Sequence, residues 1–184
     1  GPCAGGAAYS PALMDFVIMT RKNSHMFLTG PEVIKAVTGR TTTMAEIGGA
    51  EMHASVSGNV HFIAEDDQHA IALVKHILSY LPSNNTEDPP HNLSLPVSAA
   101  PDAALNDLIP DDPTEPLDMH AIIRRLVDNG ELLEVHASFA RNIIVGFARF
   151  SGVVVGVVAN QPMVMAGALA LNAADKLARF IRTC

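Results

Sequence analysis

The sequence is short of positive charge and of cysteine. Nineteen Asp and Glu residues outnumber twelve Lys and Arg residues, so the net charge at pH 7 is −7. A protein that binds nucleic acid or an anionic membrane over a broad surface needs a basic face, so this balance predicts neither partner. The only two cysteines, Cys3 and Cys184, provide no disulfide framework and are typical of a protein from a reducing compartment.

The sequence also lacks a long unbroken apolar run. Its most apolar stretch, residues 143–159, is interrupted by Arg149 and by Ser151-Gly152, which predicts strands and no membrane span. No charged segment followed by an apolar core begins the chain, so no secretory signal is expected. The 48% hydrophobic and 17% charged residues are those of a globular protein, and 184 residues suffice for one domain or pieces of two.

The chemically active side chains elsewhere in the sequence carry little signal. The eight histidines include no His-x-x-x-His spacing and no paired cysteines, so no metal is expected in this chain. His53 and Ser57 are close in sequence but lack the Gly-x-Ser-x-Gly pattern of a nucleophile elbow. Cys3 has no evident base beside it, which favours packing over a nucleophilic role. The pair Arg21-Lys22 is either a contact for a phosphate group of a ligand or, as we favour, solvated surface charge.

Prolines mark the expected boundary in the chain. Eight of the twelve lie between Pro82 and Pro116, among Ser, Asn and Asp residues. We predict a Pro-rich linker over residues 86–116, separating a first unit (1–85) from a second (117–184). An ordered loop wrapped over a core is the alternative, although a structureless loop of this length is uncommon in a compact domain.

Apolar periodicity predicts α/β layers on both sides of this boundary. Short buried strands are expected at 16–19 and 26–28, and strands at 142–149 and 152–160 form a hairpin turning at Ser151-Gly152. The expected helices run from Pro31 to Gly39, from the acidic residues 65–67 to Leu81, from the cap Asp118 to Asn129-Gly130, and over 172–183. Apolar stripes on two of them predict buried faces, at Ala70, Ile71, Val74, Ile77, Leu78 and Leu81, and at Leu177, Phe180 and Ile181.

The first residues predict a backbone site for an oxyanion. Gly5 and Gly6 lie among small residues, so a ligand can approach the main chain closely. The Ala-rich residues that follow predict a helix start whose unpaired N–H groups point into the same space. Such donors can stabilise the negative charge on a thioester oxygen as an enolate develops. The local alternative is a tight turn between strand and helix. Pro11 requires either a helix that starts near Ser10 as its cap or a kink there.

The order of motifs along the chain carries a family resemblance. The run from Gly1 to Leu13 is followed by four further groups of residues. The first is 15–19 with 24–39, and the second is Gly48-Gly49-Ala50 with His53 and Ser57-Gly58. The third is 79–85, and the fourth consists of 108–110, 118–120 and 157–162. This order resembles the carboxyltransferase (beta) subunit of biotin-dependent acyl-CoA carboxylases, in particular the propionyl-CoA carboxylase branch. The resemblance covers nearly the whole chain.

The resemblance implies a fold, a reaction and site residues. The fold is a crotonase-like superhelix of strand-strand-helix units, of which the chain would hold the end of one domain and the start of a second. The reaction moves a carboxyl group from carboxybiotin to the α-carbon of a short acyl-CoA, propionyl-CoA or alternatively acetyl-CoA. The catalytic role falls on Gly5 and Gly6, and substrate binding on Ala7, Tyr9, Gly48 and Gly49, although turns explain the last pair equally well.

The resemblance also implies partners and leaves alternatives open. Biotin would be carried by a partner, the biotin carboxylase and biotin carboxyl carrier (alpha) subunit, and the chain would assemble as dimer pairs in a hexamer, in the bacterial cytoplasm or the mitochondrial matrix. The family's second oxyanion turn is not among the 184 residues, so the isolated chain is expected to be inactive. Separately, the family has acidic positions after the Ala166-Gly167 turn, where this chain has Ala170 and Asn172, a departure in that local pocket. The alternatives are a non-catalytic assembly fragment or a subunit of a related acyl-CoA decarboxylase.

Overall fold

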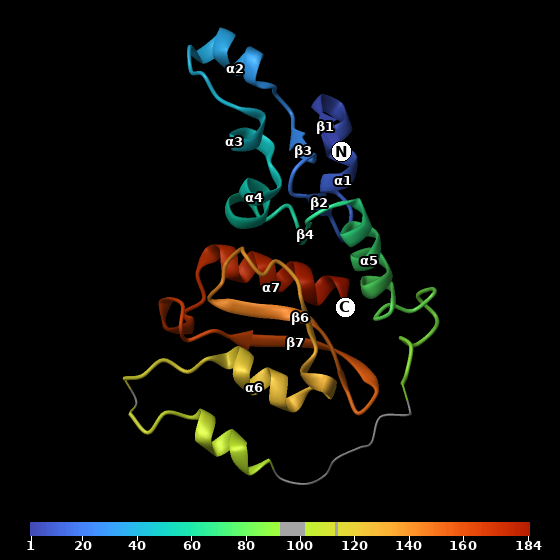
Figure 1. Ribbon diagram of the computed structural model, residues 1–184, viewed down its shortest axis with the longest axis vertical. Coiled ribbons are helices and arrows are strands. Elements are labelled where there is room, and N and C mark those ends of the chain that lie inside the picture. Colours follow the sequence, from blue (N-terminus) through green and yellow to red (C-terminus); the bar gives the residue numbers. More distant parts are fainter. Residues whose placement is uncertain (93–101, 113) are drawn as a thin grey trace. The chain divides into compact units, whose positions relative to one another are not determined.

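The computed structural model describes residues 1–92, 102–112 and 114–184. Its contacts form two compact units, one of Gly1–Lys75 with His136–Phe139 and one of His76–Val135 with Ala140–Cys184. Each unit combines helices with strands, as the sequence predicts (Figure 1). The expected linker falls within the second unit, with residues 93–101 and 113 outside the described part. The division into 1–85, 86–116 and 117–184 therefore stays a prediction.

Two pairs of short parallel strands organise the first unit. Strand β1 (Pro2–Ala4) pairs with β3 (His25–Phe27), and β2 (Ile18–Thr20) pairs with β4 (Phe62–Ala64). The strands predicted at 16–19 and 26–28 are thus confirmed to within two residues. Small and medium apolar side chains from these strands and the neighbouring helices form the core, which consists of Ala8, Val17, Met19, Met26, Ala50, Ala54 and Val60.

The helices of the first unit are short. A 3₁₀ turn (Gly5–Ala8) leads into α1 (Tyr9–Ala12), and α2 (Pro31–Thr38) ends at Gly39 as predicted. Helix α3 (Met44–Gly48), begun by a capping box at Thr43, is followed by α4 (Ala50–Met52) and a π-helix (His53–Ser57). Ser10 is not the cap expected of it, because α1 already starts at Tyr9. Pro11 then lies in the first turn, where no intrahelical bond needs its missing N–H.

Helix α5 (Asp67–Leu78) follows β4 and ends three residues before the predicted Leu81. Of its predicted apolar stripe only Ile77 is buried, whereas Ile71, Val74 and Leu78 are between 46% and 60% exposed. The helical spacing was therefore right and the burial was wrong, because no described residue covers most of that face.

The second unit is built on a three-stranded antiparallel sheet in the order β5-β6-β7, from Leu132–Glu134, Ile143–Phe150 and Val153–Asn160. The predicted hairpin is confirmed, since Phe150 pairs with Val153 across Ser151 and Gly152. Both turn residues have positive φ, of 53° and 80°, which gives a two-residue turn whose twist matches the strands. The Asp128 carboxylate accepts hydrogen bonds from both of their N–H groups, at 3.0 and 2.7 Å.

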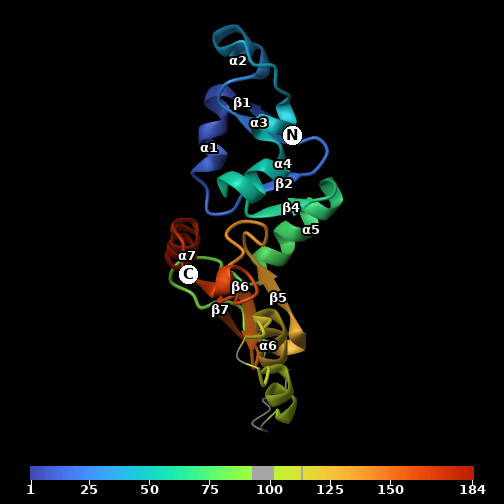
Figure 2. The same ribbon diagram turned by 90° about the vertical axis from the view of Figure 1, so that its left-hand side faces the viewer.

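Helices α6 (Met119–Leu126) and α7 (Leu171–Thr183) cover opposite faces of this sheet (Figure 2). Ile123 of α6 packs in one cluster with Ile144 and Ala148, whereas Phe180 of α7 contacts Phe147, with ring centroids 5.1 Å apart. Alternate residues of β6 point to opposite faces, so one strand serves both helices. Three further 3₁₀ turns complete the unit, at Ala103–Leu108, Asp128–Gly130 and Met165–Gly167. Within the described ranges, no helix combines the length and the apolar character that crossing a membrane requires.

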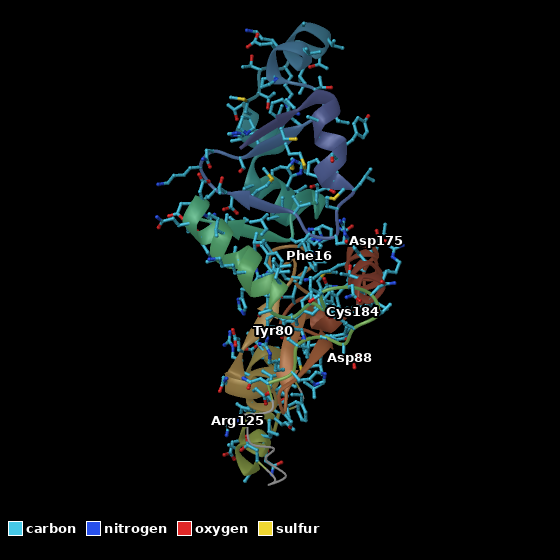
Figure 3. All side chains as sticks on the ribbon, turned by 90° about the vertical axis from the view of Figure 1, so that its right-hand side faces the viewer. Phe16, Tyr80, Asp88, Arg125, Asp175 and Cys184 are labelled. Atoms are coloured by element: carbon cyan, nitrogen blue, oxygen red, sulfur yellow. The ribbon has the colours of Figure 1, made fainter. Side chains whose placement is uncertain are left out.

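Tyr80 fixes the segment after α5 to the sheet of the second unit (Figure 3). Its side chain is 1% exposed and stacks on Phe147, and the Arg149 guanidinium carbon lies 4.3 Å from its ring centroid. Arg149 also donates to the Ser79 carbonyl at 2.8 Å. Burial raises the pKa of the Tyr80 hydroxyl. These contacts of Tyr80 and Ser79 hold the residues just after α5 against the sheet.

Helix α7 differs from the prediction in which side chains it buries: Lys176 is buried, whereas Ile181, predicted from the apolar pattern to be buried, is exposed. Lys176 is 2% exposed and Ile181 is 57% exposed, although Phe180 is buried as predicted. The Lys176 Nζ donates to the Ile143 carbonyl at 2.8 Å. Burial lowers the pKa of Lys176 to about 8, while attraction to the Glu134 carboxylate acts in the opposite direction.

This buried lysine predicts a pH-dependent stability. Below pH 8 Lys176 is charged in both the folded and the unfolded chain, so the folded chain bears the full cost of burying the charge. Between pH 8 and the ordinary lysine value of 10.5, only the unfolded chain holds the proton, so stability rises with pH by up to about 3 kcal/mol. We expect Lys176→Met to remove this rise. Melting temperatures of both forms of the full-length protein between pH 7 and 10.5 measure it, and a constant difference between them would contradict the assignment.

Candidate functional site

The Gly5-Gly6 turn lies directly after β1, at the start of the 3₁₀ turn that leads into α1. Gly5 has a φ of +62°, a conformation that other residues adopt only with strain. Beyond the chain neighbours and the backbone of the same helical turn, no atom lies within 4 Å of the position that a Cβ would occupy on Gly5 or on Gly6, so this side of the backbone is open. The first N–H groups of a helical turn have no acceptor within it. The turn therefore combines an accessible backbone at Gly5 and Gly6 with N–H donors at the start of a helical turn.

A cavity of about 470 Å³ lies beside this turn in the first unit. Its wall is mostly apolar, with a few polar groups. It is formed by residues of α1, β3, α2, α3 and the π-helix, together with the neighbouring loop residues. The lining consists of Ala8, Tyr9, Ala12, Met26, Phe27, Leu28, Thr29, Ile34, Ile47, His53 and Asn59. Of the predicted substrate-binding residues, Tyr9 lines the cavity and is 61% exposed. Ala7 is exposed in the turn itself, and its carbonyl accepts a hydrogen bond from the Cys3 thiol at 3.1 Å.

Gly48 and Gly49, the other predicted pair, are buried and are not among the residues named for the cavity wall. A Cβ on Gly48 would lie 2.3 Å from the Met26 carbonyl oxygen, and one on Gly49 would lie 2.6 Å from the Ala45 carbonyl oxygen. Close packing against β3 thus accounts for Gly48, and close approach to the backbone of α3 accounts for Gly49. Their role in binding substrate stays a prediction.

His53 is a part of the cavity wall whose contacts the sequence did not indicate. Its Nε2 lies 2.5 Å from the Met26 carbonyl oxygen and its Nδ1 lies 2.8 Å from the Ser57 hydroxyl. A carbonyl can only accept, so Nε2 carries a hydrogen, and in that tautomer Nδ1 is the acceptor for the Ser57 hydroxyl. The only signal in the sequence was the four-residue spacing of His53 and Ser57.

Arg21, one of the two basic residues considered for a phosphate contact, is already paired. Arg21 forms ion pairs with Glu51 and with Glu65, the latter at 3.0 Å. Two carboxylates thus surround the guanidinium, which favours the surface-charge interpretation over a phosphate contact. In the described part of the chain, no group of three or more His, Cys, Asp or Glu residues could hold a metal ion.

A polar cluster in the second unit connects the start of α6 to the end of β7. The Gln161 amide donates to the Asp118 carboxylate and to His120 Nδ1, both at 2.8 Å, and His120 Nε2 donates to Glu134 at 2.8 Å. The hydrogen bond from Gln161 is the main cause that lowers the pKa of Asp118. Asp118 also caps α6 as predicted, by accepting from the His120 N–H. The start of α7 lacks such a cap, because Ala170 stands there.

The family model described as "Carboxyl transferase domain" matches residues 1–184. The propionyl-CoA carboxylase beta chain of Saccharopolyspora erythraea is 50% identical over all of this chain and 35% of its own length. The methylmalonyl-CoA decarboxylase subunit alpha of Veillonella parvula is 53% identical over all of this chain and 36% of its own length. The chain therefore spans little more than a third of the length of the curated relatives it matches.

The fold is also that of a solved structure. The crystal structure of transcarboxylase 12S, described as a hexamer and holding hydrolysed methylmalonyl-coenzyme A, superposes with a TM-score of 0.96. It is 51% identical and covers 100% of this chain and 35% of its own. The likeness confirms the predicted crotonase-like α/β fold.

Proposed function

The chain belongs to the carboxyl transferase domain family, and from this membership we propose that the whole protein transfers a carboxyl group from carboxybiotin to the α-carbon of a short acyl-CoA. Propionyl-CoA is the substrate we favour and acetyl-CoA is the alternative. The observation that carries the proposal is the open Gly5-Gly6 backbone at a helical start, beside a largely apolar cavity.

The role of this chain is to stabilise the enolate of the acyl-CoA that accepts the carboxyl group. As the α-carbon loses its proton, negative charge collects on the thioester oxygen, and the electron pair then forms the new bond to the carboxyl carbon. Backbone N–H groups of Gly5 and Gly6, with Ala7 beside them, would donate hydrogen bonds to that oxygen. Such donors carry no titrating proton and need little reorganisation, which is why they are effective at a developing charge.

The apolar wall of the cavity suits the uncharged part of an acyl-CoA. Ala8, Ala12 and Met26 offer no competing hydrogen bond, and Tyr9 is placed to contact the ligand at the rim. An extra methylene in such a site changes binding by about 1–3 kcal/mol. Selection of propionyl-CoA over acetyl-CoA can therefore depend on very few contacts.

Carboxybiotin supplies the carboxyl group, and the family resemblance gives biotin the α-proton as well. The polar groups of the cavity are few, and His53 is already engaged on both nitrogens. The Gly5-Gly6 turn fits an acceptor oxygen, whereas the family's biotin-side turn is not among these residues. We therefore assign to this chain the acyl-CoA half of the site, and to a carrier subunit the delivery of biotin. Assembly as dimer pairs in a hexamer belongs to the same proposal.

A reconstituted assay of the full-length protein tests this function. With a biotin carboxylase, a biotinylated carrier, ATP and bicarbonate, we expect propionyl-CoA to be carboxylated faster than acetyl-CoA. The second candidate function follows from the likeness to a decarboxylase subunit, which predicts loss of CO₂ from methylmalonyl-CoA without ATP. Folded protein that supports neither reaction would favour the non-catalytic alternative.

The division at residues 86–116 is part of the proposal as well. Its proline-rich composition predicts that limited proteolysis cuts first between residues 89 and 104. First cleavage inside Asp67–Leu78 or Ile143–Asn160 would place the boundary elsewhere.

A further inference from the structure

Three interactions meet at the middle residues of β1 and β3. Cys3 and Met26 are partners in the register of these strands. The Cys3 thiol donates to the Ala7 carbonyl, which ties β1 to the 3₁₀ turn that contains Gly5 and Gly6. The Met26 carbonyl, in turn, accepts from His53 Nε2 across 27 residues of sequence. A continuous path of contacts therefore runs from His53 to the glycine turn.

The Met26 carbonyl is approached from a side that offers little room. Gly48 packs so closely against this oxygen that a Cβ there would lie 2.3 Å away. Met26 is 5% exposed and His53 is 7% exposed, so water cannot readily replace the imidazole as donor. A buried carbonyl without a donor is costly, and hence His53 both satisfies this oxygen and fixes its position.

Ser57 fixes the imidazole in turn. Its hydroxyl donates to His53 Nδ1 within the π-helix His53–Ser57. Helical segments of this kind are frequent at functional sites. With both ring nitrogens engaged, the ring can neither flip nor exchange its tautomer without losing a hydrogen bond.

We propose that His53, oriented by Ser57, is a positioning residue that holds β3, and through β1 the Gly5-Gly6 turn, in the geometry that acyl-CoA carboxyl transfer needs. The inference rests on the proposed function. His53 itself need not touch the reacting atoms or move a proton. A misplacement of about 1 Å at a catalytic group can cost about 10²-fold in rate, so an indirect contact of this kind is enough to matter.

Two substitutions separate the two nitrogens of the ring. In His53→Gln the side-chain amide can reach the place of Nε2 and still donate to Met26. In His53→Asn the amide reaches only the place of Nδ1, so the contact with Ser57 is kept and that with Met26 is lost. Ser57→Ala keeps the ring and removes its orienting partner.

The experiment compares these variants in the full-length protein, with carboxybiotin on its carrier and propionyl-CoA as substrates. We expect kcat of His53→Asn to lie about tenfold below that of His53→Gln, with KM for propionyl-CoA within about twofold. Ser57→Ala should fall between them. Hydrogen exchange of residues 2–8 and 25–27 should be faster in His53→Asn than in His53→Gln.

The alternatives give different results. A general acid or base at His53 would make kcat fall alike in the Gln and Asn variants and would remove a limb of the pH profile, which would overturn the proposal. Equal kcat and equal exchange in the two variants would overturn it as well. If the wild-type protein transfers no carboxyl group, the proposed function fails while the exchange comparison still decides the role of His53. If His53→Asn does not fold, Ser57→Ala against His53→Gln decides it by the same readouts.

Discussion

Replacing Gly6 by valine should lower carboxyl transfer by about 10²-fold or more in the full-length protein, an effect comparable to the loss of an oxyanion donor. The added side chain would occupy the open space through which a thioester oxygen approaches the backbone. Because no atom beyond the chain neighbours and the backbone of the same helical turn lies within 4 Å of the Gly6 Cβ position, a Cβ there meets open space. The measurement is kcat for propionyl-CoA, with a melting curve to show that the variant is folded.

Ser10→Val is the matched control for this change. It adds a similar side chain to the exposed side of α1, and Ser10 is not a residue of the cavity wall. Gly5 is a poorer choice for the test, because a Cβ at its φ of +62° would strain the fold as well. A folded Gly6→Val protein that turns over as fast as the Ser10→Val protein would remove the oxyanion assignment.

Replacing Gly48 by alanine should destabilise the protein by about 3 kcal/mol or more, at the upper end of overpacking effects. The neighbouring atom, 2.3 Å from the new Cβ, is the Met26 carbonyl oxygen. A backbone atom of a paired strand cannot move aside as the end of a flexible side chain can. The same shift would disturb the contact between Met26 and His53. We expect a lower melting temperature and less folded full-length protein on expression.

Gly30→Ala provides the comparison. A Cβ there would make ordinary contact with the Phe27 ring, at 3.6 Å. Gly30 is the N-cap of α2 in an extended conformation, where alanine is a poorer cap than glycine by about 1 kcal/mol or less. Equal melting temperatures for the two alanine variants would mean that the α3–α4 turn packs less closely on β3 than the structure has it.

Elements defined by local chemistry could be predicted from the sequence. The helix from Pro31, the cap at Asp118 and the hairpin at Ser151-Gly152 were confirmed, because each depends on residues within a few positions of one another. Burial was harder to predict. Lys176 is buried because the Ile143 carbonyl accepts from it, and Ile181 is exposed although it is apolar. Strand β5 was missed, since three residues carry too little periodicity.

The candidate site divides in the same way. The sequence pointed to Gly5 and Gly6 through their small neighbours and through the family resemblance. It offered no means of placing His53 against the Met26 carbonyl, because that contact joins segments 27 residues apart. For Gly48 the sequence left a turn and a pocket open, and the structure adds a close approach between backbones.

The most direct test of the central claim is the reverse transfer by the full-length protein, with free biotin and methylmalonyl-CoA labelled in its free carboxyl group. The account predicts that propionyl-CoA forms and that label appears on biotin, at a rate that depends on biotin and is lost in Gly6→Val. Consumption of methylmalonyl-CoA at the same rate without biotin, or no transfer by folded protein, would contradict it.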